Sequence, residues 1–353
     1  MKTNVISEAD LKLGRYRIDP EAPLLEVEDL HVEFRIEDGI VKAVNGLAYT
    51  LGKGETLAVL GESGSGKSVS HHAIMGILDT PPGYVTKGSV KFRGVELLAP
   101  HKKTGTLDHV VPEIRGTRVA MVFQDALTAL NPVFTVGWQI GEMFRVHEGL
   151  SRKAAKQRAI EMMDRVKIPS AKERVNSYPH EFSGGMRQRV MIAMALSLDP
   201  EVIIADEPTT ALDVTVQSQI MDLLKELQQD TGMGLVLITH DLAVVAEVAD
   251  SVVVMYAGRR MEKGGIEEIF HSAAHPYTLG LMKSIARPDV HLERLEPIMG
   301  SPPDLLDIPP GCPFHPRCEY VIDRCRVEIP ELYAIDEHHS SACFRWQEVQ
   351  IHV

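Results

Sequence analysis

Short apolar runs alternate with longer amphipathic stretches along much of this chain. The runs occupy positions 56–60, 202–205, 235–238 and 252–255. Their length and flanking residues are typical of buried strands in a parallel sheet. Between two of these runs, one face of a predicted helix carries Val216, Ile220, Leu223, Leu224 and Leu227. Strands that alternate with helices in this way predict an α/β layered fold.

The same pattern suggests how the chain is divided. Residues from about 137 to 198 lack strand signals and are predicted to be mostly helical, with Ser151 as the N-cap of one helix. Prolines and cysteines become frequent towards the C-terminus. We therefore expect a leader over 1–23, an α/β domain over 24–270 that includes the helical part, and a loop-rich C-terminal extension over 271–353.

The first candidate for chemistry is a Gly/Ser-rich loop between the apolar run at 56–60 and a helix-like segment at 68–78. It matches a complete P-loop pattern, made of Gly61, Glu62, Ser63, Gly64, Ser65, Gly66, Lys67 and Ser68. Glycines let backbone N–H groups surround phosphate oxygens, and the following helix N-terminus favours negative charge. We expect Lys67 to reach the β- and γ-phosphates and Ser68 to hold Mg²⁺. The alternative, a chance Gly/Ser loop, fits these flanking elements less well.

Two carboxylates follow the apolar run at 202–205. In P-loop enzymes, an acid at the end of such a strand orders Mg²⁺ or its waters, and Asp206 is in that position. Glu207 is then placed to orient or deprotonate the attacking water. An apolar strand that ends in two acids more often supplies a helix N-cap, but a P-loop upstream favours the catalytic interpretation.

A second glycine-rich helix start follows the helical part. Ser183, Gly184 and Gly185 lie between Phe182 and Met186, and an apolar helical pattern comes next. Such a helix end binds anions. One nucleotide in one P-loop does not need a second end of this kind, whereas a composite site shared between two subunits does.

These motifs, in this order, resemble the ABC (ATP-binding cassette) ATPase family over residues 24–270. The family fold is a P-loop NTPase with a helical signature subdomain, so the resemblance implies ATP and Mg²⁺ as cofactors. It identifies Ser183 to Met186 as the signature motif. The family signature usually begins with Leu and ends with Gln, whereas this chain has Phe182 and Met186. The anion-binding serine and glycines are kept.

The resemblance also implies roles for single residues. Phe34 takes the position of the aromatic residue that stacks on adenine. Gln124 is the glutamine that links the nucleotide to the transmembrane subunits, and with Ser68 and Asp206 it completes the Mg²⁺ site. Asp213 lies in the D-loop. His240 is the switch histidine that contacts the γ-phosphate, although a lone histidine after an apolar strand is usually structural.

Within that family, the chain is most similar to the ATP-binding subunits of bacterial dipeptide/oligopeptide permeases. The segments that carry this similarity are 68–70, 73–76, 130–132, 191–195 and 275–278. The resemblance implies a peripheral subunit on the cytoplasmic face of the inner membrane that powers peptide import. Its implied partners are a second ABC ATPase subunit, expected to be a different chain, two transmembrane permease subunits and an extracytoplasmic peptide-binding protein.

The sequence distinguishes peptide import less clearly from some other functions of ABC ATPases. The same motor could serve a nickel chelate, a glutathione-like peptide or an antimicrobial peptide, because the motor does not touch the cargo. A soluble ABC ATPase in DNA repair or translation is disfavoured by the single cassette. The net charge of −12 also argues against nucleic acid as a partner. No apolar run approaches the length of about 20 residues that crosses a bilayer.

Four cysteines gather near the C-terminus, namely Cys312, Cys318, Cys325 and Cys343. In a reducing cytosol, such a group favours metal or cluster binding over disulfides. Four thiolates suit either a [4Fe–4S] cluster or tetrahedral zinc. The spacing lacks the short C-x₂-C pairs of structural zinc sites. The arrangement resembles that of the permease branch, which includes members with a [4Fe–4S] cluster. A cluster is therefore expected first and zinc second, and free reduced thiols remain the third alternative.

Overall fold

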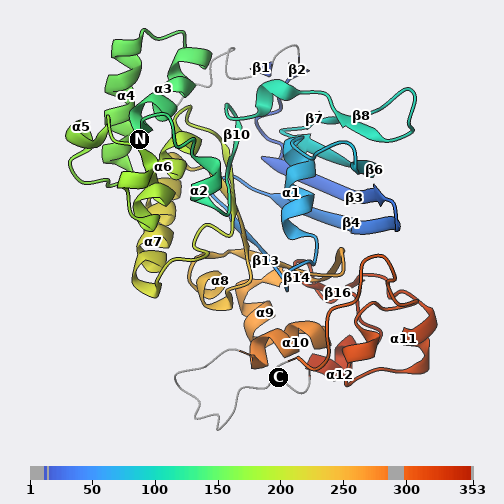
Figure 1. Cartoon of the computed structure of the whole chain (residues 1–353). Helices are drawn as coiled ribbons and strands as arrows, with labels where there is room; N and C mark the ends of the chain where they lie inside the picture. The colour runs from blue at the N-terminus through green and yellow to red at the C-terminus, as the bar shows by residue number, and fades with distance from the viewer. Residues whose placement is uncertain (1–11, 14–15, 285–297, 351–353) are drawn as a thin grey trace. The chain divides into compact units, whose positions relative to one another are not determined.

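The computed structural model describes residues 12–13, 16–284 and 298–350 (Figure 1). Most of the predicted leader, residues 1–11 and 14–15, lies outside them. Its described part contains a two-stranded antiparallel pair, β1 (Lys12–Leu13) with β2 (Tyr16–Arg17). The chain divides into two compact units. The first unit holds residues 1–112 and 239–353, and the second unit holds residues 113–238.

An antiparallel sheet opens the first unit. Leu25, Val27, Leu30 and Val32 are buried along the first strand of this sheet in chain order. The sheet order is β4-β3-β6-β9-β8, with β7 paired to β6. The strands are β3 (Leu25–Ile36), β4 (Gly39–Leu51), β6 (Gly83–Phe92), β7 (Val95–Glu96), β8 (Leu98–Pro100) and β9 (Leu107–His109).

A second group of strands in the first unit carries the P-loop helix. Strand β5 (Thr56–Leu60) pairs in parallel with β13 (Ser251–Tyr256), as the two apolar runs predicted. Antiparallel pairing continues from β13 through β14 (Arg259–Gly265) and β16 (Ser340–Ser341) to β15 (Tyr333–Ala334). The helices between these strands are α1 (Lys67–Met75), α8 (Leu242–Val248) and α9 (Ile266–His271). Figure 1 shows α1 lying along β3 and β4.

The C-terminal segment packs into the core of the first unit. Its buried Cys312, Phe314 and Cys325 join a cluster that includes Tyr256 and Tyr277. At the β14 edge, the fully buried Glu262 accepts hydrogen bonds from the backbone N–H groups of two residues before α10 and pairs with His339 at 2.8 Å. The helical pieces are α10 (Pro276–Lys283), a 3₁₀ turn (His315–Arg317), α11 (Asp323–Val327) and α12 (Trp346–Gln350).

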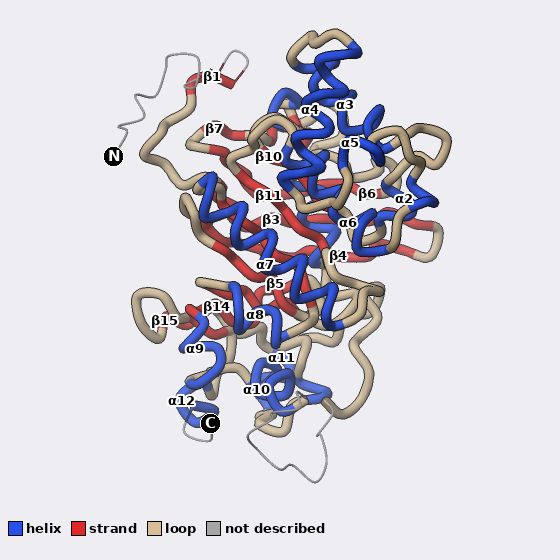
Figure 2. The backbone as a smooth tube through the Cα atoms, turned by 90° about the vertical axis from the view of Figure 1, so that its left-hand side faces the viewer, coloured by secondary structure: helices blue, strands red, loops and turns tan. Residues whose placement is uncertain are grey.

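The second unit has parallel strands and a group of helices. Strands β10 (Val119–Val122), β11 (Val202–Asp206) and β12 (Gly234–Thr239) run in parallel, and the last residue of β12 belongs to the first unit. Figure 2 shows α3 to α6 gathered together. The helices are α2 (Ala126–Ala129), α3 (Val136–His147), α4 (Arg152–Arg165), α5 (Ala171–Arg174), α6 (Gly184–Leu196) and α7 (Val214–Thr231), with 3₁₀ turns at Pro112–Ile114 and Pro179–Glu181.

The helix predictions for this unit are confirmed. Ser151 caps α4 by accepting the Ala154 backbone N–H at 3.3 Å. The apolar face predicted for α7 is buried at Ile220, Leu223 and Leu224. None of the helices that the structure describes is both long enough and apolar enough to span a membrane.

Candidate active site

The P-loop joins buried β5 to α1 through backbone that only glycine adopts easily. Gly66 is the N-cap of α1 with φ +98°, and a Cβ there would lie 2.2 Å from the Ala43 carbonyl oxygen. Because glycine has no side chain, no side-chain cap occupies the first turn of α1. The backbone N–H groups of that turn therefore face the loop, which is the arrangement that binds phosphate at a helix N-terminus.

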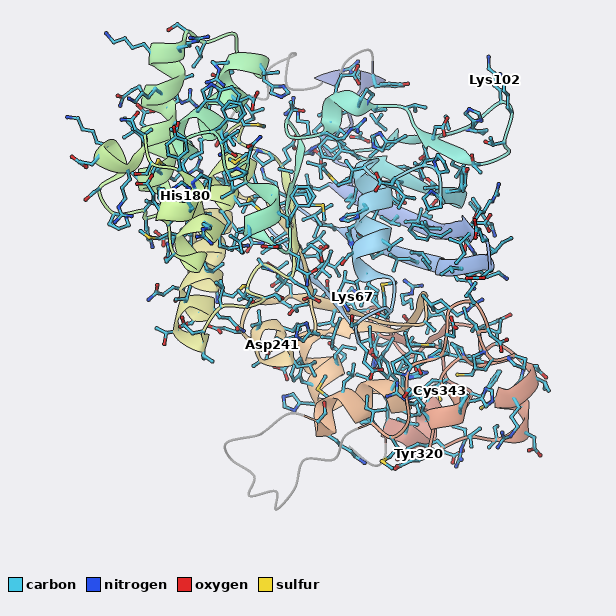
Figure 3. All side chains as sticks on the ribbon, viewed as in Figure 1. Lys67, Lys102, His180, Asp241, Tyr320 and Cys343 are labelled. Atoms are coloured by element: carbon cyan, nitrogen blue, oxygen red, sulfur yellow. The ribbon has the colours of Figure 1, made fainter. Side chains whose placement is uncertain are left out.

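Lys67 lies at the N-terminal end of α1 (Figure 3). Its side chain is buried, and its ammonium group donates to the carbonyl oxygens of Gly61 at 2.6 Å and Glu62 at 2.9 Å. These carbonyl oxygens compensate a buried charge. The two carbonyl oxygens also hold the Lys67 ammonium group against the loop, where it can pair with a bound phosphate. Ser68 follows in the first turn and is half-buried.

In the second unit, the end of β11 brings three polar residues together. Glu207 has φ +43°, an unusual conformation for a residue other than glycine, and such strain is concentrated at functional sites. Its carboxylate oxygen Oε2 accepts hydrogen bonds from Gln124 Nε2 at 3.1 Å and Thr210 Oγ1 at 2.8 Å. The preceding Asp206 is buried. The sequence motifs identified Gln124 and Glu207 independently of each other, and the structure places the two side chains in direct contact.

The glycine-rich start of α6 is also a helix N-terminus, but an exposed one. Ser183 caps it by accepting the Met186 backbone N–H at 3.4 Å, and Ser183 and Gly184 face solvent. Gly185 lies against α7, where a Cβ would approach Val216 Cγ1 to 2.4 Å. Asp213 caps α7 and accepts the Val216 backbone N–H at 3.0 Å.

The predicted site residues are distributed over both units. The first unit contains the P-loop, His240, which is exposed after β12, and Phe34, which is half-buried on β3 opposite Gly83. The second unit contains Gln124, Asp206, Glu207, Asp213 and the signature residues Ser183, Gly184 and Gly185. The catalytic and binding roles of these residues are taken up below as proposals.

All four cysteines have free thiols and line one small cavity (Figure 3 labels Cys343). Burial raises the pKa of Cys312 to about 11 and the pKa values of Cys318 and Cys343 to about 12, and neighbouring cysteines add to each shift. Over the described part of the chain, no group of three or more His, Cys, Asp or Glu side chains is arranged to hold a metal ion.

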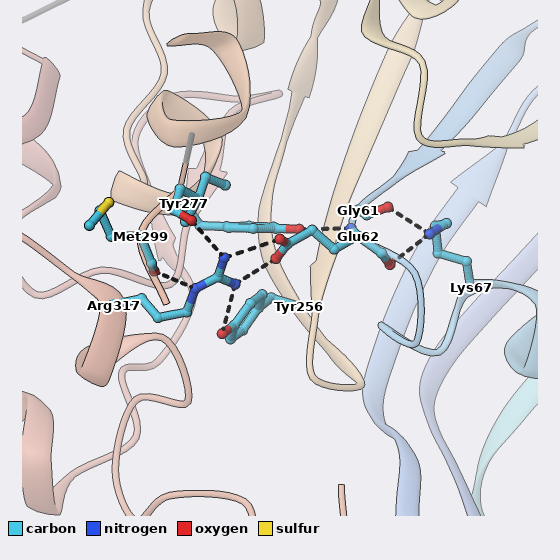
Figure 4. Close-up of polar contacts among 8 residues, drawn as sticks. Gly61, Glu62, Lys67, Tyr256, Tyr277, Met299 and Arg317 are labelled. Carbon is cyan, nitrogen blue, oxygen red and sulfur yellow. Dashed lines mark hydrogen bonds and ion pairs between the residues drawn. The ribbon is translucent and has the colours of Figure 1, made fainter. Parts of the chain in front are cut away.

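Sequence reasoning missed three residues next to the P-loop. Arg317 binds the Glu62 carboxylate, Tyr277 accepts the Glu62 backbone N–H, and the Tyr256 hydroxyl contacts Arg317 (Figure 4). Tyr277 lies in a segment that carries the permease resemblance and Arg317 directly precedes Cys318, but no local pattern relates either residue to a loop more than 200 positions away.

Two family models match the chain. The ABC transporter model matches residues 44–210, and the model of the oligopeptide/dipeptide transporter C-terminal region matches residues 261–325. A peptide import ATP-binding protein of Brucella abortus is 47% identical over 93% of this chain and 98% of that protein. The chain belongs to the ABC transporter family. The oligopeptide transport ATP-binding proteins OppD of Haemophilus influenzae and Salmonella typhimurium are each 48% identical to this ABC protein, over 91% and 92% of its length and 97% and 95% of theirs.

Solved structures agree with this assignment. A dimeric ATP-binding cassette in a post-hydrolysis state, bound to ADP and phosphate, matches with a TM-score of 0.59 and 26% identity, over 69% of this chain and 98% of that one. A Clostridium perfringens protein, part of the ABC transporter complex CbiONQ, matches with a TM-score of 0.58 and 30% identity, over 71% and 91%. The predicted P-loop α/β fold is confirmed. This ABC protein is an ATPase coupled to transport that uses ATP and Mg²⁺.

Proposed function

We propose that this ABC protein hydrolyses ATP to drive the import of short peptides through a membrane transporter. The observation that carries the proposal is the Glu207 carboxylate, held by Gln124 and Thr210 at the end of β11 in a chain with a complete P-loop. A carboxylate fixed in this way can orient an attacking water. The peptide cargo is supported by the names of the relatives and by the match to the C-terminal region of oligopeptide/dipeptide transporters.

Each motif has a proposed role in this reaction. Lys67 binds the β- and γ-phosphates, Phe34 stacks on the adenine, and His240 contacts the γ-phosphate. Mg²⁺ prefers oxygen donors, and each of its proposed ligands Ser68, Gln124 and Asp206 offers one. Bound Mg²⁺ neutralises charge that develops on the phosphate oxygens. The remaining P-loop residues surround the phosphates with their backbone N–H groups.

The exposed start of α6 is proposed to act on a nucleotide held by a facing cassette. Ser183 and Gly184 face solvent, so a ligand carried by another subunit can reach them. Asp213 of the D-loop is proposed to take part in the same interface. The implied partner is a second ABC ATPase, expected to be a different chain.

The second unit also offers a surface for membrane-spanning subunits. Large apolar side chains are exposed over β10, α2 and α3, and the Phe134 and Trp138 rings stack with centroids 4.2 Å apart. The stacked Phe134–Trp138 pair forms an exposed apolar patch, and such patches are typical of interaction sites. The exposed residues are Phe123, Leu127, Val133, Phe134, Trp138 and Val146. We propose that two permease subunits dock here on the cytoplasmic face of the bacterial inner membrane, and that an extracytoplasmic binding protein delivers the peptide.

The test is transport by the complete complex. This ABC protein would be reconstituted in proteoliposomes with its permeases, partner ATPase and binding protein, and uptake of labelled di- to pentapeptides would be measured with ATP hydrolysis. We expect peptides to stimulate both, and Glu207→Gln to abolish both. If a nickel chelate or glutathione stimulated ATP hydrolysis and peptides did not, the proposed cargo would be wrong but the proposed motor role would stand.

We also propose that the four cysteines hold one [4Fe–4S] cluster. They line the same cavity, and backbone N–H groups near Cys312, Cys318 and Cys343 favour the thiolate forms, against the effect of burial. Each thiolate of such a cluster binds a different iron, so the sulfur atoms need not converge on one point as tetrahedral zinc requires. The cysteine spacing lacks the short C-x₂-C pairs of structural zinc sites, so the cluster is favoured over zinc. When bound, a cluster would cross-link the loops of this segment.

Anaerobic purification tests the cluster directly. We expect brown protein with about four irons per chain and broad absorption around 400 nm. Cys343→Ser should lose the iron, whereas the control His338→Ala, an exposed residue nearby, should keep it. One equivalent of zinc in colourless protein would indicate structural zinc instead, and metal-free protein with four titratable thiols would contradict both metals.

A further inference from the structure

A guanidinium group from the cysteine segment reaches the P-loop. Arg317 binds the Glu62 carboxylate through two hydrogen bonds, from Nη1 to Oε2 at 2.6 Å and from Nη2 to Oε1 at 3.1 Å (Figure 4). The Arg317 side chain is only 5% exposed, and that of Glu62 is 27% exposed. Forked pairs of this kind are among the stronger and more geometrically specific ion pairs in proteins.

The position of Arg317 is fixed by the C-terminal segment and β13. It ends the 3₁₀ turn between Cys312 and Cys318. Its Nε donates to the Met299 carbonyl oxygen at 3.0 Å, and Nη1 contacts the Tyr256 hydroxyl at 3.3 Å. Burial lowers the pKa of Arg317, but the hydrogen bonds to Glu62 and Tyr256 outweigh burial and leave it above its usual value. The guanidinium is therefore charged and held from several sides.

Glu62 is held at three points. Its carboxylate binds Arg317, its backbone N–H donates to the Tyr277 hydroxyl at 2.8 Å, and its carbonyl oxygen accepts from Lys67 Nζ at 2.9 Å. Two of the three contacts come from the C-terminal segment. The second residue of the P-loop thus has its conformation set before any nucleotide arrives. Preorganisation of this kind raises affinity because less ordering is required on binding.

The charge of Glu62 makes the ion pair matter for phosphate binding. A triphosphate is strongly anionic, and a carboxylate in the loop that surrounds it would repel it. Arg317 compensates that carboxylate. Removal of Arg317 would leave a partly buried negative charge unpaired beside the phosphate site, and an uncompensated charge costs more than the loss of an exposed pair.

We propose that Arg317 is a positioning residue for nucleotide binding: it fixes Glu62 and neutralises its charge, so that the C-terminal cysteine segment helps to shape the phosphate cradle. The inference rests on the proposed function, in which the P-loop binds ATP. It goes beyond that function, because it gives the C-terminal segment a direct part in nucleotide affinity.

The test is the nucleotide affinity of the full chain, measured by calorimetric titration with ATP and with AMP. Arg317→Ala should weaken ATP binding about tenfold, which is the scale of a charge-assisted hydrogen-bonded pair. AMP, which lacks the β- and γ-phosphates, should bind as it does to wild type. The matched control is Arg324→Ala, which breaks an exposed ion pair with Glu328 in the same segment and should stay within about twofold of wild type.

Two further variants exclude a merely structural role. Glu62→Gln introduced into Arg317→Ala should recover most of the lost ATP affinity, because it removes the unpaired charge. Arg317→Lys keeps the charge without the fork and should weaken binding about threefold, which provides a measurement even if the alanine variant does not fold. Equal losses for ATP and AMP, additive losses in the double variant, or wild-type affinity in Arg317→Ala would each overturn the proposal.

Failure of the proposed function would look different. If wild-type protein did not bind ATP, or if Lys67→Ala bound it normally, the P-loop assignment itself would be wrong. Loss of binding in Lys67→Ala together with wild-type affinity in Arg317→Ala would overturn only the role of Arg317.

Discussion

The two glycine-rich helix starts of this ABC protein differ in what their glycines do. At the start of α1, Gly66 has a positive φ and lies against the Ala43 carbonyl oxygen, and buried Lys67 follows it. At the start of α6, Gly185 is needed because α7 approaches closely, while Ser183 and Gly184 face solvent. Backbone conformation explains why glycine is needed at position 66, and side-chain packing explains why it is needed at position 185.

The difference shows how much of each site is built within its own unit. The α1 end has a charged lysine and the Arg317–Glu62 pair around it. The α6 end has a serine cap that already accepts the Met186 N–H. Its exposed Ser183 and Gly184 are accessible to a ligand held by another subunit. The α1 end is therefore suited to bind a nucleotide, and the α6 end is suited to complete a site on another subunit.

The largest expected effect separates binding at α1 from turnover. Glu207→Gln should lower the ATPase rate of the assembled transporter by about 10²- to 10⁴-fold, because it removes the carboxylate that we propose orients water. ATP affinity should stay within about threefold of wild type, since the α1 cradle is intact. Steady-state hydrolysis and nucleotide titration measure the two quantities. Turnover within about tenfold of wild type would reject the assignment of Glu207.

The next effect tests whether the α6 end serves another subunit. Ser183→Arg should lower turnover of the assembled transporter about 100-fold, because it disturbs donors aimed at the developing charge. ATP binding by the isolated chain should not change. The matched control is Ser151→Arg, which removes the equivalent cap of α4 and should leave turnover near wild type. Weaker ATP binding by the isolated Ser183→Arg chain would contradict the comparison.

A stability measurement tests the packing explanation for Gly185. Gly185→Ala places a Cβ 2.4 Å from Val216 Cγ1, and overpacking of this kind should destabilise the protein by about 1–3 kcal/mol in urea unfolding. Gly184→Ala is the control, because its Cβ would lie 3.4 Å from Leu212 in ordinary contact. That variant should be neutral or slightly stabilising, since alanine favours helix. Equal changes in the free energy of unfolding for the two variants would contradict the packing explanation for Gly185.

The smallest effect concerns the two departures from the usual signature. Phe182 is buried with Arg174 over its ring, and Met186 contacts the same arginine through its sulfur. Neither side chain changes the Ser183 cap. Phe182→Leu and Met186→Gln should therefore change the ATPase rate of the assembled transporter by less than about threefold, with Phe182→Leu costing about 1 kcal/mol of stability. A change larger than tenfold would assign these positions a part in the reaction.

Elements with a strong local pattern could be predicted from sequence. The apolar runs at β11 and β12 and the apolar face of α7 depend on burial that repeats along the chain, so periodicity finds them. The predicted helix ends were less accurate than the predicted elements themselves. The helix expected over 68–78 ends at Met75, because Gly76 adopts φ +65° and its N–H bonds to the Ala73 carbonyl oxygen.

Pairs that depend on tertiary packing could not be predicted. The motif residues Lys67, Glu207 and Ser183 stand out because loops that bind phosphate constrain a few consecutive positions. Arg317 and Glu62 are 255 residues apart, and their contact follows from how the C-terminal segment packs against β13 and α10. The contact between Gln124 and Glu207 likewise joins two strand ends, 83 positions apart in the chain.

The buried pair at the β14 edge has a consequence for biosynthesis. Glu262 emerges during translation 77 residues before His339. At about 5–20 residues per second, roughly 4 to 15 s pass before its partner is made. Until then β14 lacks its neighbour β16, and an unpaired strand edge is a template for association with other chains. Nascent chains of this protein therefore expose the β14 edge to association with other chains in that interval, and a ribosome pause between β14 and β16 would lengthen the exposure.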